Sequence, residues 1–190
     1  ETDLPLGNAV AIEFLGPIAV AVLGNRSFKN LASLAIASLG VLFLAQVTSE
    51  GSLTGVLLAL AAGALWALYI ILGSRVARSG AHLDGLGVGM LIGGLVISPT
   101  ALASIGNVFE HPVLILVALS TGILGNVIPY GIDQIALQRI TKARFAFLQA
   151  LLPATASCVG FIALQQRATI NEVVGIGMII FAILLRGKET

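Results

Sequence analysis

The sequence predicts an all-α membrane protein with seven transmembrane helices. Its 190 residues are 57% hydrophobic and 10% charged, and the mean hydropathy is +1.03. A soluble domain of this size has too little interior to bury so much apolar surface. The apolar residues also form seven separate runs, and a helix needs about 20 such residues to cross a hydrocarbon core about 30 Å thick. Continuous runs without strand-like alternation favour helices.

Each run is expected to form one helix, because charged and turn residues separate it from the next. The first run follows an acidic start, and the later runs begin and end at short charged gaps. In chain order the runs lie at roughly 4–24, 30–47, 52–74, 85–105, 112–138, 143–164 and 170–185.

The charges of the gaps alternate along the chain. In order, the gaps hold Arg26 and Lys29, Glu50, Arg75 and Arg78, Glu110, Arg139 with Lys142 and Arg144, Arg167 and Glu172, and finally Arg186 and Lys188. Nine of the ten basic residues thus fall on one side of the membrane, and only Arg167 on the other. Basic loops favour the cytoplasmic side. We therefore expect a multi-pass protein of the inner (plasma) membrane, with residue 1 outside and the C-terminus in the cytoplasm.

A weak internal repeat relates residues 14–24 to residues 150–160. Both segments share a leucine, a proline two residues later and a glycine seven residues after the proline, and a second apolar run follows each copy. Residues 1–48 would then be the last two helices of a truncated first repeat, and residues 49–190 a complete five-helix second repeat. Because five is an odd number, successive repeats would have opposite orientations, as in many transporters.

Two carboxylates lie within the predicted spans, Glu13 in the first and Asp133 in the fifth. A charge at membrane depth is costly, so such a residue usually faces a cavity or a partner. Burial disfavours the charged form of a carboxylate, and these two groups are therefore candidates for proton exchange or for binding a substrate ammonium. Asp133 stands six residues before Arg139, so reaching the cytoplasmic interface is an open alternative for its side chain.

The fifth span is the most polar. Asn126, Tyr130 and Asp133 are spaced by four and three residues, which places them on one face of a helix, with Gln134 beside them. Pro129 removes one backbone hydrogen bond, and freed carbonyls with polar side chains could line an aqueous cavity. The alternative is that these groups bond to neighbouring helices and only hold the bundle together.

Three further residues complete the candidate site. Trp66 and Tyr69 share a face of the third span, where they either pack in the core or line a substrate path. Gln149 aligns with Glu13 in the repeat. The predicted substrate- or proton-binding residues are Glu13, Asp133, Asn126, Tyr130, Gln134, Trp66, Tyr69 and Gln149, and the predicted helix kinks are at Pro17, Pro129 and Pro153.

The sequence contains no motif for enzyme catalysis or for metal binding. The sequence has no phosphate-binding glycine loop, paired zinc-ligand motif or Gly-x-Ser-x-Gly, and His82 and His111 are isolated. We therefore expect neither an enzyme nor a metal or cofactor site. The basic residues are dispersed at helix ends, which argues against a nucleic-acid partner. The single cysteine, Cys158, lies in an apolar run and is predicted to be buried.

At this point the sequence resembles a known family. Residues 4–17 (LPLGNAVAIEFLGP) resemble the fourth helix of EamA-type transporters of the drug/metabolite transporter superfamily, and the threonine/homoserine exporter branch is the closer match. Residues 127–139 (VIPYGIDQIALQR) resemble the eighth helix, where an acidic residue occupies the position of Asp133, and residues 64–69 (ALWALY) resemble the sixth. The resemblance implies helices 4 to 10 of a ten-helix carrier built from two five-helix inverted repeats.

The resemblance also implies a function. Such a carrier is a secondary transporter that exports small metabolites, here an amino acid such as threonine or homoserine, by proton antiport and alternating access. The expected partners are a small-molecule substrate and the lipid bilayer, with a homodimer as a possible assembly. One open alternative is a non-transporting fragment or assembly subunit. A heptahelical receptor is the other, although a retinal-type protein needs a lysine within a span and none lies there.

Overall fold

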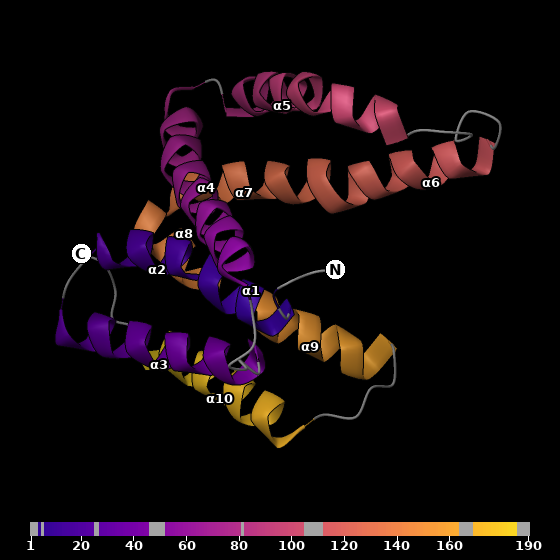
Figure 1. The fold of residues 1–190 in the computed structure, drawn as a ribbon. Coiled ribbons are helices and arrows are strands. Elements are labelled where there is room, and N and C mark those ends of the chain that lie inside the picture. The colour runs from indigo at the N-terminus through magenta and orange to yellow at the C-terminus, as the bar shows by residue number, and fades with distance from the viewer. Residues whose placement is uncertain are drawn as a thin grey trace. The chain divides into compact units, whose positions relative to one another are not determined.

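The computed structural model describes residues 4, 6–24, 27–45, 52–80, 82–104, 112–163 and 169–185. All regular structure in these segments is helical, which confirms the predicted all-α class. The elements are α1 (Leu6–Glu13), α2 (Leu15–Val22), α3 (Phe28–Ala45), α4 (Leu53–Arg78), α5 (His82–Ser104), α6 (Pro112–Gly122), the π-helix η2 (Ile123–Val127), α7 (Ile128–Arg139), α8 (Lys142–Leu148), α9 (Leu151–Ala163) and α10 (Ile170–Leu185) (Figure 1).

Part of the orientation prediction falls on residues that are not described. The charged residues and the histidine concerned are Arg26, Glu50, Glu110, His111, Arg167, Arg186 and Lys188, and they lie outside the described residues.

Four stretches of helix are long and apolar enough to cross a membrane. They are α3, α4, the part of α5 from Leu83 to Thr100, and the continuous run α6–η2–α7 from Val113 to Arg139, and they correspond to the second to fifth predicted spans. The first predicted span is divided into α1 and α2, and the sixth into α8 and α9. The seventh is α10, which has 16 residues. Length and composition thus support four of the seven predicted spans among the described residues.

The chain forms two compact units. The first unit comprises Glu1–Ile71 and Thr141–Thr190, and the second comprises Leu72–Ile140. The helix α4 contributes its longer first part to the first unit and its last two turns to the second.

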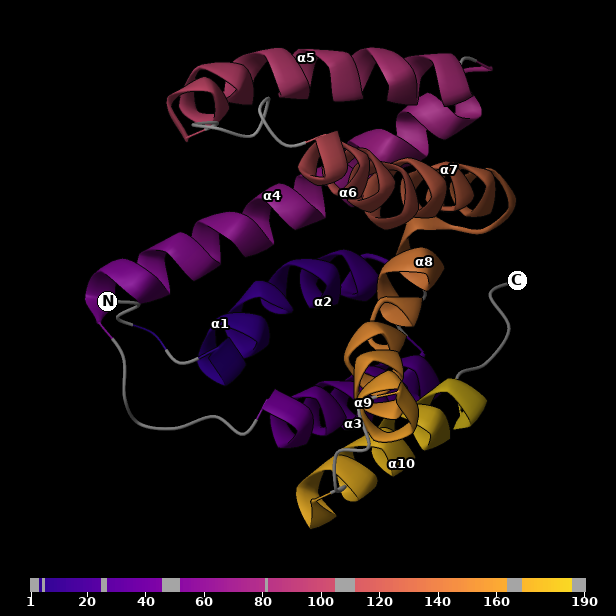
Figure 2. The same cartoon turned by 90° about the vertical axis from the view of Figure 1, so that its right-hand side faces the viewer.

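In the first unit, α3 and α10 form the most extensive helix pair and lie side by side in both views (Figure 1 and Figure 2). Gly40 and Gly175 face each other where the two backbones meet, and Ile179 beside them is fully buried. Small residues at a crossing let two helices approach closely, which strengthens their van der Waals contact. The prediction for Cys158 is wrong: the thiol is exposed, because burial of α9 is limited to its first turn among the described side chains.

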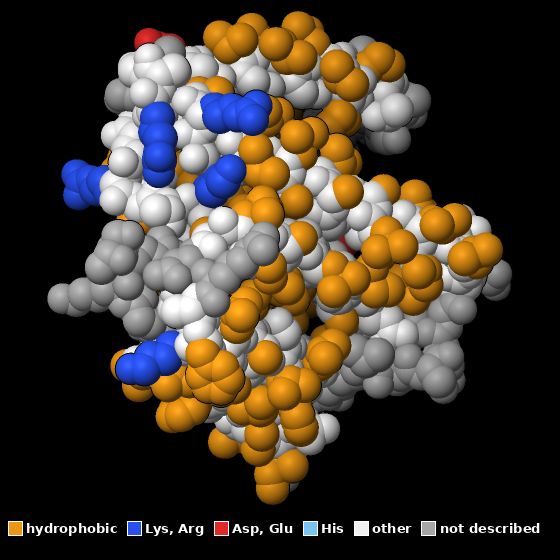
Figure 3. Space-filling view, turned by 90° about the vertical axis from the view of Figure 1, so that its left-hand side faces the viewer, with side chains coloured by type: hydrophobic (Ala, Val, Ile, Leu, Met, Phe, Trp, Pro, Cys, Tyr) orange, Lys and Arg blue, Asp and Glu red, His pale blue; other side chains and the backbone are white. Residues whose placement is uncertain are grey.

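In the second unit, α5 contacts α7. Pro99 lies inside α5 and has no N–H for the carbonyl of Leu95. The hydroxyl of Ser98 donates to that carbonyl at 2.8 Å, so the helix continues through the proline. The described side chains of α5 from Leu83 to Thr100 include no buried one, and the buried residues of α6–η2–α7 are Gln134 and Leu137, near its end. Hydrophobic side chains cover much of the surface of the molecule drawn in Figure 3. Such surface suits contact with lipid.

Hydroxyl side chains mark the starts of four helices. Ser27, Ser52 and Thr141 each accept a hydrogen bond from the backbone N–H three residues later. At α10, Thr169 and Glu172 form a reciprocal capping box, with the N–H of Thr169 donating to Glu172 Oε2 at 2.7 Å and the N–H of Glu172 donating to Thr169 Oγ1 at 3.3 Å. The local sequence therefore fixes where these helices begin.

Candidate functional site

Glu13 ends α1 at a break in the helix. Pro17, four residues later, has no N–H to donate to the carbonyl of Glu13. Helical hydrogen bonds resume on either side of the break, where Phe14 N–H donates to Val10 O at 3.0 Å and Ile18 N–H donates to Phe14 O at 3.1 Å. The half-buried Glu13 side chain thus lies where a backbone carbonyl lacks its helical hydrogen bond.

The first part of α4 packs directly on this break. A Cβ at Gly63 would lie 2.8 Å from the carbonyl oxygen of Glu13, and a Cβ at Gly16 would overlap the carbonyl of Gly63. Only glycines allow this approach. It brings the ring of Phe14 against Trp66 in an edge-to-face contact, with centroids 5.1 Å apart and planes at 76°. The predicted site residues Glu13 and Trp66 therefore belong to one contact region, and the half-buried Tyr69 lies one turn further along α4.

A matching break separates α8 from α9. Pro153 stands four residues after Gln149, whose carbonyl instead accepts from the N–H of Leu152 at 3.0 Å. The helix α9 begins two residues before Pro153, just as α2 begins two residues before Pro17. The half-buried Gln149 thus occupies the same place in its break as Glu13 does in the first.

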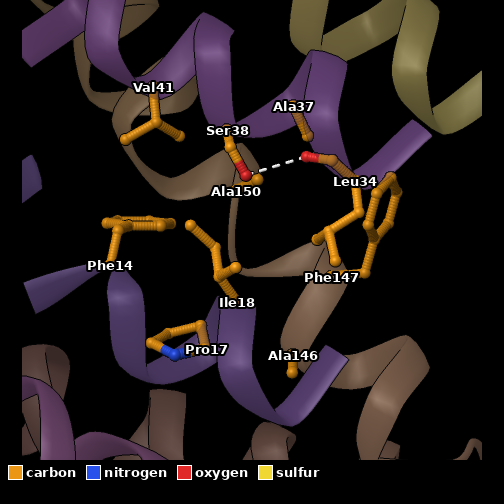
Figure 4. A pocket seen from close by; sticks show the side chains of 10 residues that line it. All are labelled: Phe14, Pro17, Ile18, Leu34, Ala37, Ser38, Val41, Ala146, Phe147 and Ala150. Atoms are coloured by element: carbon orange, nitrogen blue, oxygen red, sulfur yellow. Dashed lines mark hydrogen bonds between the residues drawn. The ribbon is translucent and has the colours of Figure 1, made fainter. Parts of the chain in front are cut away.

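A small cavity of about 10 Å³ lies between the two breaks (Figure 4). Phe14 and Pro17 line it from the first break, and Phe147 and Ala150 from the second. From α3, the hydroxyl of Ser38 donates to Leu34 O at 2.8 Å, and Ser38 is the polar side chain of the lining. The volume is about the least that one water molecule needs, so this cavity is too small for an amino acid.

The second unit carries the other predicted residues on α6–η2–α7. The N–H of Ile128 donates to the carbonyl of Ile123, five residues earlier, which defines the wider π turn. Pro129 follows at the start of α7 and cannot donate. The prediction of a single face assumed a continuous α-helix, whereas the π turn alters the angle between Asn126 and Tyr130. Isolated π turns are frequent at functional sites.

The four polar residues of this run differ in burial. Asn126 is exposed and Tyr130 is 37% exposed, whereas Asp133 is half-buried and Gln134 is only 2% exposed. The Oε1 atom of Gln134 is buried and has no hydrogen-bond partner in the described part of the chain. An unsatisfied buried acceptor costs about 1–3 kcal/mol, and among the described candidate residues this cost falls on Gln134.

The predicted residues thus fall into two sets within separate units. The first unit holds Glu13, Trp66, Tyr69 and Gln149 with Pro17 and Pro153, and the second holds Asn126, Tyr130, Asp133 and Gln134 with Pro129. Among the described residues, no group of three or more His, Cys, Asp or Glu side chains could hold a metal. Sequence reasoning missed Phe14, Gly16 and Gly63, although a glycine three residues before Trp66 and another three residues after Glu13 were visible signals.

Comparisons with known proteins agree with the resemblance. A family model described as the EamA-like transporter family matches residues 53–186. The threonine/homoserine exporter RhtA of Escherichia coli (strain K12) is 36% identical over 182 residues, and RhtA of Salmonella typhimurium (strain LT2) is 35% identical over 182 residues. Each match covers 94% of this chain and 61% of the relative, so the chain spans less than two thirds of these proteins. No solved structure matches the chain.

Proposed function

Because this chain belongs to the EamA-like transporter family, we propose that it is a membrane carrier exporting small metabolites, with amino acids such as threonine or homoserine as substrates. The observation that carries the proposal is the 36% identity to a protein named threonine/homoserine exporter, which extends over 94% of the chain. The apolar helices α3, α4, α5 and α6–α7 support the membrane location.

Transport would proceed by alternating access coupled to proton antiport. Glu13 and Asp133 would take up and release the proton or bind the substrate ammonium, because a carboxylate provides the opposite charge and several acceptor sites. Support comes from their positions. Glu13 ends α1 beside the glycine crossing with α4, and the half-buried Asp133 lies on α7 after a π turn and a proline.

The remaining candidates would shape the substrate path. Trp66 and Tyr69 would contribute aromatic surface from α4, Asn126, Tyr130 and Gln134 polar groups from α6–α7, and Gln149 a polar group at the second break. Pro17, Pro129 and Pro153 would kink these helices. The matching positions of the breaks before Pro17 and Pro153 support two repeats of opposite orientation, divided at residues 1–48 and 49–190. The basic ends of α4 and α7 support a cytoplasmic C-terminus and an external residue 1.

The test is uptake of labelled threonine into inverted membrane vesicles that contain this chain, with and without a protonophore. Inverted vesicles turn an exporter into an uptake system, so threonine should accumulate and the protonophore should abolish accumulation. Glu13→Gln and Asp133→Asn should each lower the initial rate at least about tenfold, since each removes a charge that acts in the transport step. Asp84→Asn is the matched control: its carboxylate is exposed at the start of α5 and lies outside the proposed site.

Uptake equal to that of empty vesicles, with insertion verified, would contradict the proposal for this chain. Protonophore-insensitive uptake would instead contradict the proton coupling and leave export in place. If Asp84→Asn reduced uptake as much as Asp133→Asn, the loss would reflect charge in general and the assignment of Asp133 would be wrong.

A further inference from the structure

Three arginines of the second unit lie in the last turns of two helices, α4 and α7. Arg75 and Arg78 are in the last turn of α4, and Arg139 is in the last turn of α7. The guanidinium of Arg78 donates to the carbonyl of Ile140, the residue after Arg139, at 3.3 Å, so the two helix ends are joined. All three side chains are exposed.

Little of the positive charge of this arginine cluster, Arg75, Arg78 and Arg139, is neutralised by acidic side chains. The exposed Asp84 at the start of α5 is the acidic residue that follows in the chain, but no ion pair joins it to the three arginines in the described residues. A guanidinium has five N–H donors in a planar fork, and the bond to Ile140 uses one donor of Arg78. The cluster therefore presents several unused donors and an excess positive charge, which match a phosphate oxygen in geometry and sign.

Apolar side chains lie directly below the cluster on the same helix faces. Leu72 precedes Arg75 by three residues, and Ile135 precedes Arg139 by four, so each pair is stacked along one face. Both apolar side chains are 44% exposed. A phosphate site with an apolar surface beneath it fits an amphiphile, and a free phosphate would leave that surface unused.

We propose that the arginine cluster binds the headgroup of an anionic phospholipid, with the acyl chains against α4 and α7. Anionic lipids attract basic residues next to membrane spans, each basic residue contributing about a fivefold gain in binding. The site lies on the side predicted to be cytoplasmic. Its occupancy would hold the ends of α4 and α7 together, because one phosphate can accept from arginines of both helices.

The experiment measures lipid binding by the purified full chain in a neutral detergent, by native mass spectrometry and by the midpoint of thermal unfolding. Phosphatidylglycerol should bind and raise the midpoint, whereas phosphatidylcholine and inorganic phosphate should have little effect. Replacing all three arginines by glutamine (R75Q/R78Q/R139Q) should weaken phosphatidylglycerol binding about a hundredfold, and each single replacement about fivefold. Lys29→Gln, an exposed basic residue on α3, is the control and should bind as the unaltered chain does.

Several results would overturn the proposal. Equal binding of phosphatidylcholine would show that charge plays no part, and a full effect of inorganic phosphate would remove the lipid as the ligand. Unchanged phosphatidylglycerol binding by the triple variant, or an equal loss in Lys29→Gln, would place the site elsewhere. Should the triple variant not fold, the single variants and the charge-retaining R75K/R78K/R139K test the same site. The lysine variant should bind between the unaltered chain and the glutamine variants, because it keeps the charge and loses the planar fork.

Discussion

Replacing Gly40 by alanine should push α3 and α10 apart. A Cβ at Gly40 would lie 2.8 Å from the carbonyl oxygen of Gly175 and 2.8 Å from Cγ1 of Ile179. Carbon atoms normally approach to about 3.5–4.0 Å, so the helices would separate by roughly 0.7 Å or more, or Ile179 would leave its place. Overpacking of this kind costs about 1–3 kcal/mol, and alanine returns about 1 kcal/mol through its higher helix propensity.

Gly177→Ala on α10 is the matched control, since a Cβ there would meet nothing within 4 Å. This variant gains the higher helix propensity of alanine without the clash. The free energy of unfolding of Gly40→Ala should therefore fall about 1–3 kcal/mol below that of Gly177→Ala. The assay is reversible unfolding of the purified chain in detergent, titrated with a denaturing detergent.

The double variant of Gly40 and Gly175 tests the geometry independently. A Cβ at Gly175 would lie 2.8 Å from the carbonyl oxygen of Gly40, so both substitutions disturb the same contact. Once the first alanine has separated the helices, the second should cost less, and the two effects should differ from their sum by at least about 0.5 kcal/mol. Strict additivity, or equal stability of Gly40→Ala and Gly177→Ala, would refute the close approach of α3 and α10.

Three further substitutions test other parts of the molecule by the same unfolding assay. Gln134→Met keeps the volume and removes the unpartnered buried acceptor, so it should stabilise the chain by up to about 1–3 kcal/mol; a loss of stability would contradict this prediction. Phe147→Ala should cost about 3–5 kcal/mol, because the ring is 2% exposed beside the cavity, while Phe181→Ala, at 56% exposure, should cost far less. Thr169→Ala should cost about 1 kcal/mol by removing the cap of α10, and similar damage from Thr155→Ala, whose hydroxyl bonds within α9, would contradict this.

Hydropathy alone predicted the helical class and placed the long helices to within a few residues. The third run was expected at 52–74 and forms α4 from Leu53 to Arg78. The free energy of transferring a helix into lipid is summed over many residues, so the prediction of a span depends little on any single position. The helix ends were less predictable, because basic residues such as Arg75 and Arg78 prolong a helix beyond its apolar part while their charges reach the interface.

The candidate site was predictable as residue types and less so as an arrangement. Polar residues inside apolar runs are visible in the sequence, and this selected Glu13, Asp133 and Gln134. The contact of Phe14 with Trp66 depends on the glycine crossing of two helices that are distant in sequence, which periodicity does not reveal. The position of a π turn depends on where a local shift of hydrogen bonds costs least free energy. The sequence analysis assumed α-helical geometry from Asn126 to Tyr130, and the angle predicted between these two side chains was therefore wrong.

The three prolines show how one sequence feature leads to different local structures. Each lacks the N–H that would reach the carbonyl four residues earlier, and those carbonyls belong to Glu13, Gly125 and Gln149. The carbonyl of Gln149 accepts from Leu152 instead, and the residues around Gly125 adopt a π turn. The carbonyl of Glu13 lies against Gly63 of α4. A carbonyl that has lost its helical donor is costly in lipid. At the crossing with α4, this carbonyl of Glu13 and the carboxylate of the same residue lie together. That combination, rather than the carboxylate alone, is why we expect Glu13→Gln to reduce transport while the helix break itself persists.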